Sequence, residues 1–383
     1  MVVMWIFAGV LFSLTCFYAV GLLVVRKKWL AVGDSQKTSS DGLKISVLVA
    51  ARNEEKSLGR LLEALGGQQF QPEEIIVVND HSDDATRSVL EAWSDRLPNL
   101  RILDNIGQGK KSAVAYGVTQ ATGDVIAVTD ADCWMESVWL AGLAGGFSDE
   151  KVKMVCAPVY IQPDGGFLSK AQTWEMAALG MVAGVAIKSG SPLFCNAANM
   201  AFRKDVFLEV GGYEGNAHIP SGDDEFLLRK IKESYPGGVE YVAGANVLVR
   251  TGAQENLKKF LSQRRRWAGK WNASGFGLTA VVALSVLAFH LMNLSAYAFS
   301  FSGFLPWWLL VSQQAVKLVS EYVFLQVFFF NKEDVPGFPS FMLTGILYPL
   351  YAVVVGFTAN RGGYEWKGRK YEAPNEKARP VKG

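Results

Sequence analysis

A run of five residues, Ile45-Ser46-Val47-Leu48-Val49, has the composition of a buried β-strand. The segments that follow alternate in the same way between helical spacing and short apolar strands, at Lys56 to Leu65, Ile75 to Val78, Asp84 to Trp93, Leu100 to Leu103, Lys111 to Thr119 and Val125 to Val128. This alternation predicts an α/β fold with a mostly parallel sheet and helices on both faces. In such sheets ligands bind beyond the carboxyl ends of the strands.

Apolar segments flank this region on both sides. Val2 to Val25 contains no charged residue, and Arg26, Lys27 and Lys28 follow directly. A helix of that length crosses a hydrocarbon core of about 30 Å, and the basic flank predicts an integral protein of the cell inner membrane whose next domain faces the cytoplasm. A cleaved signal peptide is the alternative, but its positive charges would precede the apolar run.

The carboxy-terminal part contains about three further apolar segments. Three full crossings would leave the basic tail outside, against the positive-inside rule, so we expect one segment to be interfacial. Lys317 and Glu321 point to Leu305 to Phe330 as that segment, and the pair is compatible with a functional role or a structural salt bridge. We therefore divide the chain into a transmembrane helix at 1–28, a linker at 29–43, a cytoplasmic domain at 44–270, a membrane region at 271–360 and a basic tail at 361–383.

Composition excludes several classes of protein. With 50% hydrophobic and 19% charged residues, the chain is too apolar for an ordinary soluble enzyme. A formal net charge of +2 predicts no nucleic-acid partner. The four cysteines lie far apart without a C-x-x-C pair, so neither a zinc site nor a disulfide framework is expected.

The sharpest local signal is a pair of carboxylates, Asp130 and Asp132, at the end of the strand Val125 to Val128. Side chains two apart on an extended strand point the same way, so both can reach one divalent cation. Mg²⁺ or Mn²⁺ is held by such carboxylates together with phosphate oxygens, which suits a nucleotide diphosphate. A solvated loop is the alternative for an isolated D-x-D.

Candidate binding residues also follow the first two strands. Ala51, Asn53 and Glu54 follow the first strand, and Asp80 follows the second. The turn after Asp80 can simply cap the next helix, yet Asp80 also faces the crevice, where it can bind a base or ribose. Three strand ends are therefore expected to converge on one site.

Two further segments carry charges suited to a diphosphate and an acceptor. Gly109-Lys110 lacks the spacing of a P-loop, but a glycine turn with lysine before a helix can still bind phosphate. Asp223 and Asp224 begin a later helix, where they either cap it or act as a general base toward an acceptor hydroxyl. Gln263-Arg264-Arg265-Arg266-Trp267 is either a basic membrane-surface helix or a source of a guanidinium for the leaving diphosphate.

Taken in order, these motifs resemble those of the family 2 inverting glycosyltransferases with a GT-A fold, from about Lys44 to Lys270. The matching residues are Asn53-Glu54-Glu55, Asn79 to Asp84, Gly109-Lys110, Asp130 to Asp132, Gly222-Asp223, and Gln263 with Arg266 and Trp267 of a Q-x-x-R-W motif. The resemblance implies a GT-A domain that uses a nucleotide diphosphate sugar and a divalent metal.

The resemblance also implies roles for single residues. Asp80 would bind the nucleobase, Lys110 the donor phosphates, and Asp132 the metal with help from Asp130. Asp223 would be the general base, with Asp224 as its rival because Gly222 stands where the family usually has Glu. The acceptor side would include Asn199, and Gln263, Arg266 and Trp267 would close over the diphosphate. Asn79 and His81 depart from the family's turn.

The expected activity is inverting transfer of a sugar, from a uridine diphosphate donor, to a lipid or lipid-linked acceptor at the membrane. The tail Trp366-Lys367-Gly368-Arg369-Lys370-Tyr371 is similar to an ending of lipid-directed members, including hopanoid, carotenoid and sphingolipid glycosyltransferases. A processive polysaccharide synthase is the nearest alternative, although it usually needs more spans. A second alternative is a non-catalytic membrane scaffold that only binds nucleotide.

Overall fold

The computed structural model describes residues 1–33, 42–216, 222–268, 278–358, 364–367 and 369–371. A seven-stranded sheet forms its centre, with the strand order β3-β2-β1-β4-β8-β6-β9. These strands are β1 (Ile45–Ala51), β2 (Glu74–Asn79), β3 (Leu100–Asp104), β4 (Val125–Asp130), β6 (Met154–Cys156), β8 (Met200–Arg203) and β9 (Val239–Tyr241). Strands β1 to β4 are parallel, whereas β8 runs antiparallel to β4 and β6, so the structure confirms the predicted α/β fold with a mixed, mostly parallel sheet.

Helices cover both faces of this sheet because the strand residues alternate between two cores. Leu48 packs with α4, whereas Val47 and Val49 pack with α2 and α5 on the other face. The helices around the sheet are α2 (Leu58–Gly66), α3 (Thr86–Ser94), α4 (Lys110–Gln120), α5 (Trp139–Gly145), α7 (Lys204–Glu209) and α8 (Asp223–Ser234). Helix α3 begins two residues later than predicted, because the Asp84 carboxylate accepts hydrogen bonds from the backbone and hydroxyl of Thr86.

The strand order places a binding crevice near β1 and β4. The chain adds strands on one side of β1 as far as β3 and then crosses to the other side with β4. Helices connected in opposite directions leave a crevice beyond the carboxyl ends of the strands at such a switch point. The predicted residues after β1 and β4 lie at this edge.

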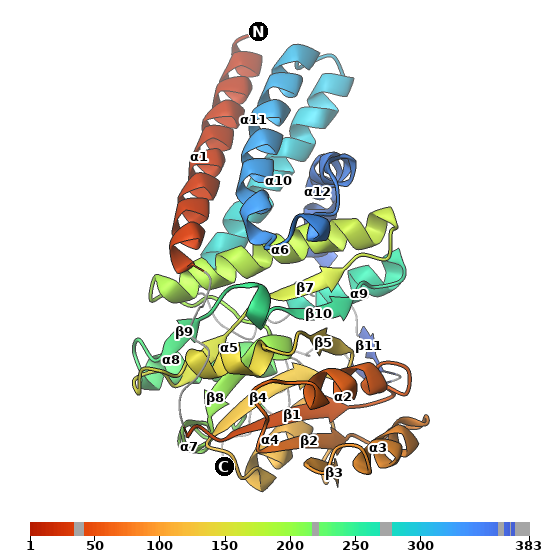
Figure 1. The fold of residues 1–383 in the computed structure, drawn as a ribbon. Helices are drawn as coiled ribbons and strands as arrows, with labels where there is room; N and C mark the ends of the chain where they lie inside the picture. Colours follow the sequence, from red (N-terminus) through yellow and green to blue (C-terminus); the bar gives the residue numbers. More distant parts are fainter. Residues whose placement is uncertain (34–41, 217–221, 269–277, 359–363, 368, 372–383) are drawn as a thin grey trace, which may run out of the picture.

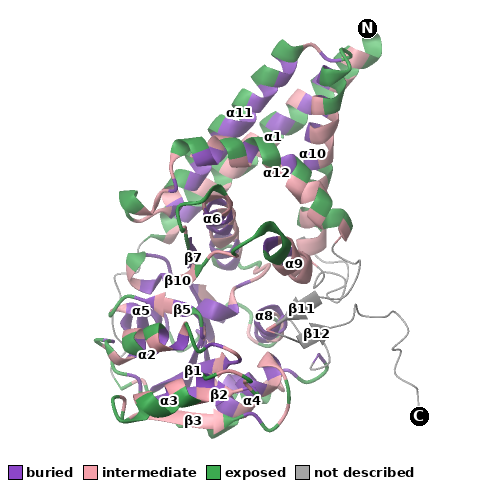
Figure 2. Cartoon of the chain, turned by 90° about the vertical axis from the view of Figure 1, so that its right-hand side faces the viewer, coloured by how far each residue is buried: buried purple, intermediate pink, exposed green. Residues whose placement is uncertain are grey.

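A second sheet and a long helix connect this domain to the apolar helices. The sheet consists of β5 (Cys133–Met135), β10 (Val249–Gly252) and β7 (Val159–Gln162). Helix α6 (Phe167–Lys188) follows β7 and lies across the molecule between the sheets and the upper helices (Figure 1). Its buried residues are spread around the helix, since it contacts the domain on one side and α1 and α12 on the other (Figure 2).

Three helices of the described chain are long and apolar enough to cross a membrane. They are α1 (Val2–Val32), α10 (Leu278–Phe301) and α12 (Phe338–Thr358). Helix α1 continues past the expected end at residue 28, because Trp29 is buried, stacks on Phe328 and donates its indole N–H to the carbonyl of Val327 at 3.1 Å.

Helix α11 (Trp307–Leu325), which lies in the segment expected at the interface, instead runs along α1. Gln313 bonds the hydroxyl of Thr15 at 2.8 Å, and Arg26 bonds the carbonyl of Val323 at 3.1 Å, so the two helices run in the same direction. Polar residues of α11 such as Gln313 and Gln314 are buried against α1 and α10, so α11 does not need to be uniformly apolar to lie beside them.

The buried charges of α11 are satisfied within the protein. The Lys317 ammonium lies 2.9 Å from the Glu321 carboxylate and 2.9 Å from the carbonyl of Gly345, and Tyr18 donates to Glu321 at 3.0 Å. Lys317 is fully buried. A pair with this many partners offsets the cost of burying charge, which favours the structural interpretation over a functional one.

Helix α12 begins and ends on the side of the sheet domain. Just before it, the Asp334 carboxylate pairs with Arg250 at 2.9 Å. Beyond it, the chain returns through β11 (Tyr364–Trp366) and β12 (Arg369–Tyr371), and Lys367 between them pairs with Glu54 at 2.6 Å. A helix that crossed a hydrocarbon core of about 30 Å could not have both ends at one domain. We therefore infer that α12, and not the segment of α11, is the interfacial one.

This arrangement predicts the side on which two loops lie. In a Cys16→Ser background, Ser302→Cys between α10 and α11 should react with a membrane-impermeant maleimide only from the side opposite the sheet domain. Lys332→Cys between α11 and α12 should react from the domain side, as should the control Asp95→Cys on the domain surface. All three positions are exposed. Labelling of positions 302 and 332 from the same side would contradict the inference that α11 crosses and α12 does not.

Candidate functional site

One cavity of about 650 Å³ extends from the carboxyl edge of the sheet to the apolar helices. At the sheet end it is lined by Lys110, Asp130 and Asp132. Its walls come from the start of α8 and from α9 (Leu257–Ala268), and its far end from α6, α10 and α12. The volume is in the range of small-molecule sites, and the two ends differ sharply in polarity.

Lys110 joins two of the predicted carboxylates at the sheet end. Its ammonium lies 2.6 Å from Asp130 and 3.1 Å from Asp223. Burial alone would lower the pKa of Lys110, but the negative charges of Asp130, Asp223 and Asp224 outweigh it, so this pKa is raised above its ordinary value. The lysine therefore stays charged, and residues from three separate segments meet at one point.

Asp132 lies in a negative environment. Burial and the nearby carboxylates of Asp130 and Glu54 raise the pKa of Asp132 to about 6, although Lys367 opposes this shift. An ionised carboxylate among like charges is destabilised by their repulsion, and a cation that binds beside it stabilises it. The surroundings of Asp132 therefore favour the binding of a divalent ion.

The residues present fit such an ion when it arrives with a substrate. Among the described residues, no three His, Cys, Asp or Glu side chains come together to hold a metal by themselves. Mg²⁺, however, is commonly bound by one or two carboxylates with phosphate and water completing its shell. Asp130 and Asp132 both line the cavity and can supply that partial set.

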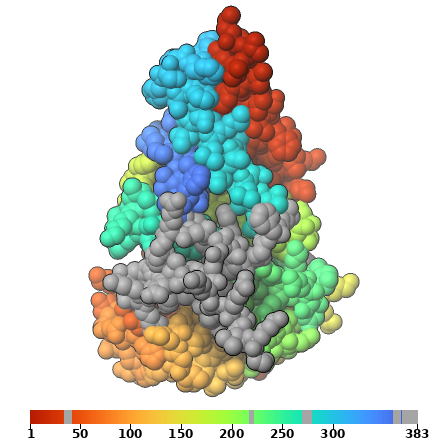
Figure 3. Space-filling model, turned by 180° about the vertical axis from the view of Figure 1, so that it is seen from behind, coloured from red at the N-terminus to blue at the C-terminus, as the bar shows by residue number. Residues whose placement is uncertain are grey.

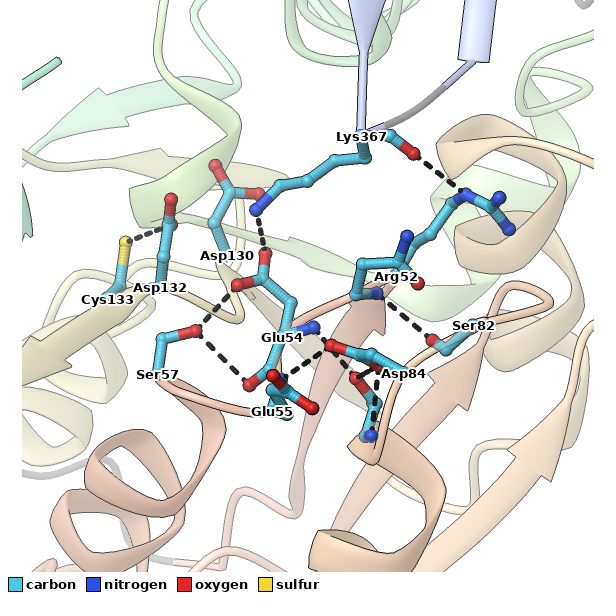
Figure 4. A network of polar contacts seen from close by, with 12 residues as sticks. Arg52, Glu54, Glu55, Ser57, Ser82, Asp84, Asp130, Asp132, Cys133 and Lys367 are labelled. Carbon is cyan, nitrogen blue, oxygen red and sulfur yellow. Dashed lines mark hydrogen bonds and ion pairs between the residues drawn. The ribbon is translucent and has the colours of Figure 1, made fainter. Parts of the chain in front are cut away.

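Glu54 lies in a network that the sequence did not predict (Figure 4). Its carboxylate accepts hydrogen bonds from Lys367 at 2.6 Å and from Ser57 at 2.6 Å. Arg52 donates to the carbonyl of Lys367 at 3.1 Å. The tail is thus fastened to the end of β1. The W-K-G-R-x-Y segment was a signal for Lys367, but only the fold brings it to this strand end.

The remaining residues predicted at the ends of β1 and β2 mainly hold the loops together. The carbonyl of Ala51 accepts the backbone N–H of Asp80 at 2.8 Å. Asn53 has a left-handed backbone, with φ of 53°, and its side chain accepts the N–H of Asp83 at 2.8 Å. None of Ala51, Asn53, Glu54 and Asp80 lines the cavity itself.

Asp80 organises the loop that carries Lys110. Its carboxylate is 2% exposed and accepts hydrogen bonds from the side chain of Asn105 at 2.7 Å and from the backbone N–H of Gly109 at 3.0 Å. Gly109 has φ of 91°, a conformation that favours glycine. In this structure Asp80 therefore positions Lys110, and the nucleobase contact stays a prediction.

Three acidic residues begin α8, and all of them line the cavity. Asp223, Asp224 and Glu225 are less than a tenth exposed, and they follow Gly222, whose φ is 85°. The left-handed turn at Gly222 aims the start of the helix at Lys110, which explains the contact with Asp223. A helix amino terminus also stabilises negative charge.

Helix α9 places Gln263, Arg266 and Trp267, to which the resemblance gave a role in closing over the diphosphate, in the cavity wall. The sequence did not single out Arg264, which is 3% exposed and lies 2.6 Å from the carboxylate of Glu175 on α6. The Arg264 guanidinium also lies over the ring of Trp267, 4.3 Å from its centroid. This buried pair ties α9 to α6.

Asn199 lies away from the cavity, unlike the acceptor residue that the resemblance implied. Its side chain is fully buried, donates to the carbonyls of Pro158 at 2.6 Å and Val247 at 2.8 Å, and accepts the indole N–H of Trp139 at 3.0 Å. The side-chain oxygen and nitrogen of Asn199 thus make hydrogen bonds that stabilise the fold. Asn196, three residues earlier, lines the cavity instead.

Comparison with known sequences places the domain among glycosyltransferases. A family model described as Glycosyl transferase family 2 matches residues 46–211. The chain is 29% identical over 234 residues to a probable glycosyltransferase, YdaM, of Bacillus subtilis (strain 168), covering 59% of this chain and 54% of that protein. It is 24% identical over 230 residues to a glucosyl-dolichyl phosphate glucuronosyltransferase of Haloferax volcanii, covering 57% of this chain and 70% of that protein. The chain thus spans only about half the length of the first of these relatives.

Among solved structures, the mannosyltransferase PcManGT from Pyrobaculum calidifontis has a similar fold. The TM-score is 0.58 at 17% sequence identity, and the match covers 92% of this chain and 97% of that one. The similarity therefore includes the apolar helices as well as the sheets. Residues 46–211 thus match the glycosyl transferase family 2 model, and the fold is GT-A-like, in a chain that also carries long apolar helices.

Proposed function

We propose that the chain is an integral membrane glycosyltransferase that moves a sugar, with inversion, from a nucleotide diphosphate donor to a lipid acceptor. The observation that carries the proposal is the single cavity that contains Asp130, Asp132 and Asp223 at one end and apolar side chains of α10 and α12 at the other. A water-soluble donor and a lipid could meet in such a cavity without either leaving its own phase.

The donor end suits a nucleotide diphosphate. Lys110 and the N–H groups at the start of α4 offer positive charge to the two phosphates. Asp130 and Asp132 would hold Mg²⁺ or Mn²⁺, which neutralises charge on the departing diphosphate. The structure of PcManGT in complex with GDP-mannose and Mn²⁺ is compatible with this chemistry. We expect a uridine diphosphate sugar here.

Asp223 is the candidate general base, since it is buried in the cavity wall within 3.1 Å of Lys110. It would take the proton of an acceptor hydroxyl as the oxygen attacks the anomeric carbon from the side opposite the diphosphate. Asp224 is the alternative base from the same turn. Arg266 would offset charge on the leaving group, with Gln263 and Trp267 closing that wall.

The location follows from the helices and their charges. Arg26, Lys27 and Lys28 lie near the end of α1 that joins the domain. We therefore propose that α1 anchors the chain in the inner membrane and that the catalytic domain faces the cytoplasm, where nucleotide sugars are made available.

Two variants should separate donor binding from chemistry. Asp132→Asn should weaken Mn²⁺-dependent binding of the nucleotide diphosphate and abolish transfer, because one metal ligand is lost. Asp223→Asn should retain nucleotide binding but lower turnover by about 10²- to 10⁴-fold, the usual contribution of a general base. Calorimetry with UDP and Mn²⁺, together with transfer from labelled nucleotide sugars, measures both effects.

The matched control is Asp95→Asn, which changes an exposed carboxylate just after the end of α3 and should leave both quantities unchanged. If both Asp132→Asn and Asp223→Asn transferred sugar at the wild-type rate, the assignment of the site would be wrong. If Asp224→Asn abolished transfer and Asp223→Asn did not lower it, the general base would be Asp224 and not Asp223.

The acceptor end can be tested by filling it. Ala283 of α10 lines the cavity, whereas its neighbour Val282 is exposed on the outside of the helix. Ala283→Phe should raise the KM for a lipid acceptor while leaving donor binding unchanged, because the added ring occupies the apolar end. Val282→Phe should leave both unchanged. Equal kinetics for the two variants would argue against a lipid in this part of the cavity.

A further inference from the structure

The charges lining the cavity are unequal. Among its described lining residues are the six carboxylates of Asp130, Asp132, Glu175, Asp223, Asp224 and Glu225, against the three cations of Lys110, Arg264 and Arg266. The formal charge of this lining is therefore −3, and it becomes −2 when Arg229, which pairs with Glu225 at 3.5 Å from outside the lining, is counted as well. A divalent cation that arrives with a nucleotide diphosphate adds about as much negative as positive charge, so the excess persists when the donor is bound.

Two of the three cations already have carboxylate partners. Lys110 lies between Asp130 and Asp223, at 2.6 and 3.1 Å. Arg264 is 3% exposed, lies 2.6 Å from Glu175, and is packed against the rings of Phe260 and Trp267. Freeing Arg264 for an incoming anion would leave Glu175 buried without its countercharge, which is costly.

Among the described residues, the side chains nearest the membrane offer the acceptor little positive charge. Tyr351 donates its hydroxyl to Glu175 at 2.5 Å, so the polar group at this end is a carboxylate that already holds Arg264 as its partner. Around it lie apolar residues of α6, α10 and α12, namely Leu179, Ala183, Ala283, Leu287, Ala352 and Val355. Apolar tails fit this lining, whereas a phosphate monoester would bring about −1.5 to −2 further charges at neutral pH.

The acids of α8 point to the same conclusion. A phosphate acceptor already carries an ionised oxygen and needs no general base, whereas a neutral hydroxyl does. Asp223 and Asp224 would repel the phosphate at the place where it must react, yet they suit a hydroxyl that has to lose its proton.

We propose that the acceptor is an uncharged lipid with a free hydroxyl group, and not a lipid phosphate. This rests on the proposed function and narrows its substrate class. The hydroxyl oxygen forms the new bond to the anomeric carbon, and its proton passes to Asp223. The bond from that carbon to the diphosphate oxygen breaks, and its electron pair leaves with the nucleoside diphosphate.

The test uses the full-length protein in detergent with Mn²⁺ and a panel of radiolabelled nucleotide sugars. Lipids from the cells that natively make the protein are divided by anion exchange into a neutral and an anionic fraction, and undecaprenyl phosphate is added to the latter. We expect labelled lipid from the neutral fraction, with a preference of at least about a hundredfold, because opposed like charges are strongly unfavourable. The product should stay neutral and resist mild acid, which cleaves glycosyl phosphates.

Asp223→Asn supplies a second readout. With a hydroxyl acceptor, its transfer to the neutral fraction should fall by at least about 10²-fold while UDP binding persists. Labelled product only from the anionic fraction, labile to mild acid, would overturn the neutral acceptor and leave the proposed transferase intact. No labelled lipid from either fraction, with any donor, would overturn the proposed function itself.

Discussion

Four carboxylates, from Glu54, Asp130, Asp132 and Asp223, lie at the carboxyl edge of the central sheet, and two lysines pair with three of them. Lys110 pairs with Asp130 and Asp223, and Lys367 pairs with Glu54. Carboxylates gathered in a partly buried region repel one another unless positive charge is placed among them. The loop before α4 and the tail each bring a lysine to these carboxylates, and the turn before α8 brings Asp223 to Lys110.

The same interactions connect the carboxyl edge of the sheet to the apolar helices. Lys367 lies beyond α12, so its contact with Glu54 brings the chain back to the domain after the last apolar helix. On the opposite wall, Arg264 and Glu175 join α9 to α6, the helix that carries the apolar bundle. The cavity is therefore enclosed by elements that are fixed to one another by buried ion pairs, which explains how a polar end and an apolar end share one space.

The pairs within the bundle have a different role. Lys317 and Glu321 contact each other, and within the protein they also contact the carbonyl of Gly345 and the hydroxyl of Tyr18. These contacts connect α11 to α12 and α1 and compensate the buried charges. They are directed at other helices, away from the carboxylates at the edge of the sheet.

The sequence by itself determined the alternating core and the chemistry of the strand ends. Strand periodicity depends only on neighbouring residues, so Ile45, Ile75 and Val125 could be assigned to strands, and Asp130 and Asp132 to a strand end, without the fold. Only the tertiary structure decided that Asp80 holds Gly109, that Asn199 serves the core, and that α12 returns to the domain. These depend on contacts between residues far apart in the chain, such as Lys367 with Glu54, and no local pattern encodes which distant partner will neutralise a buried charge.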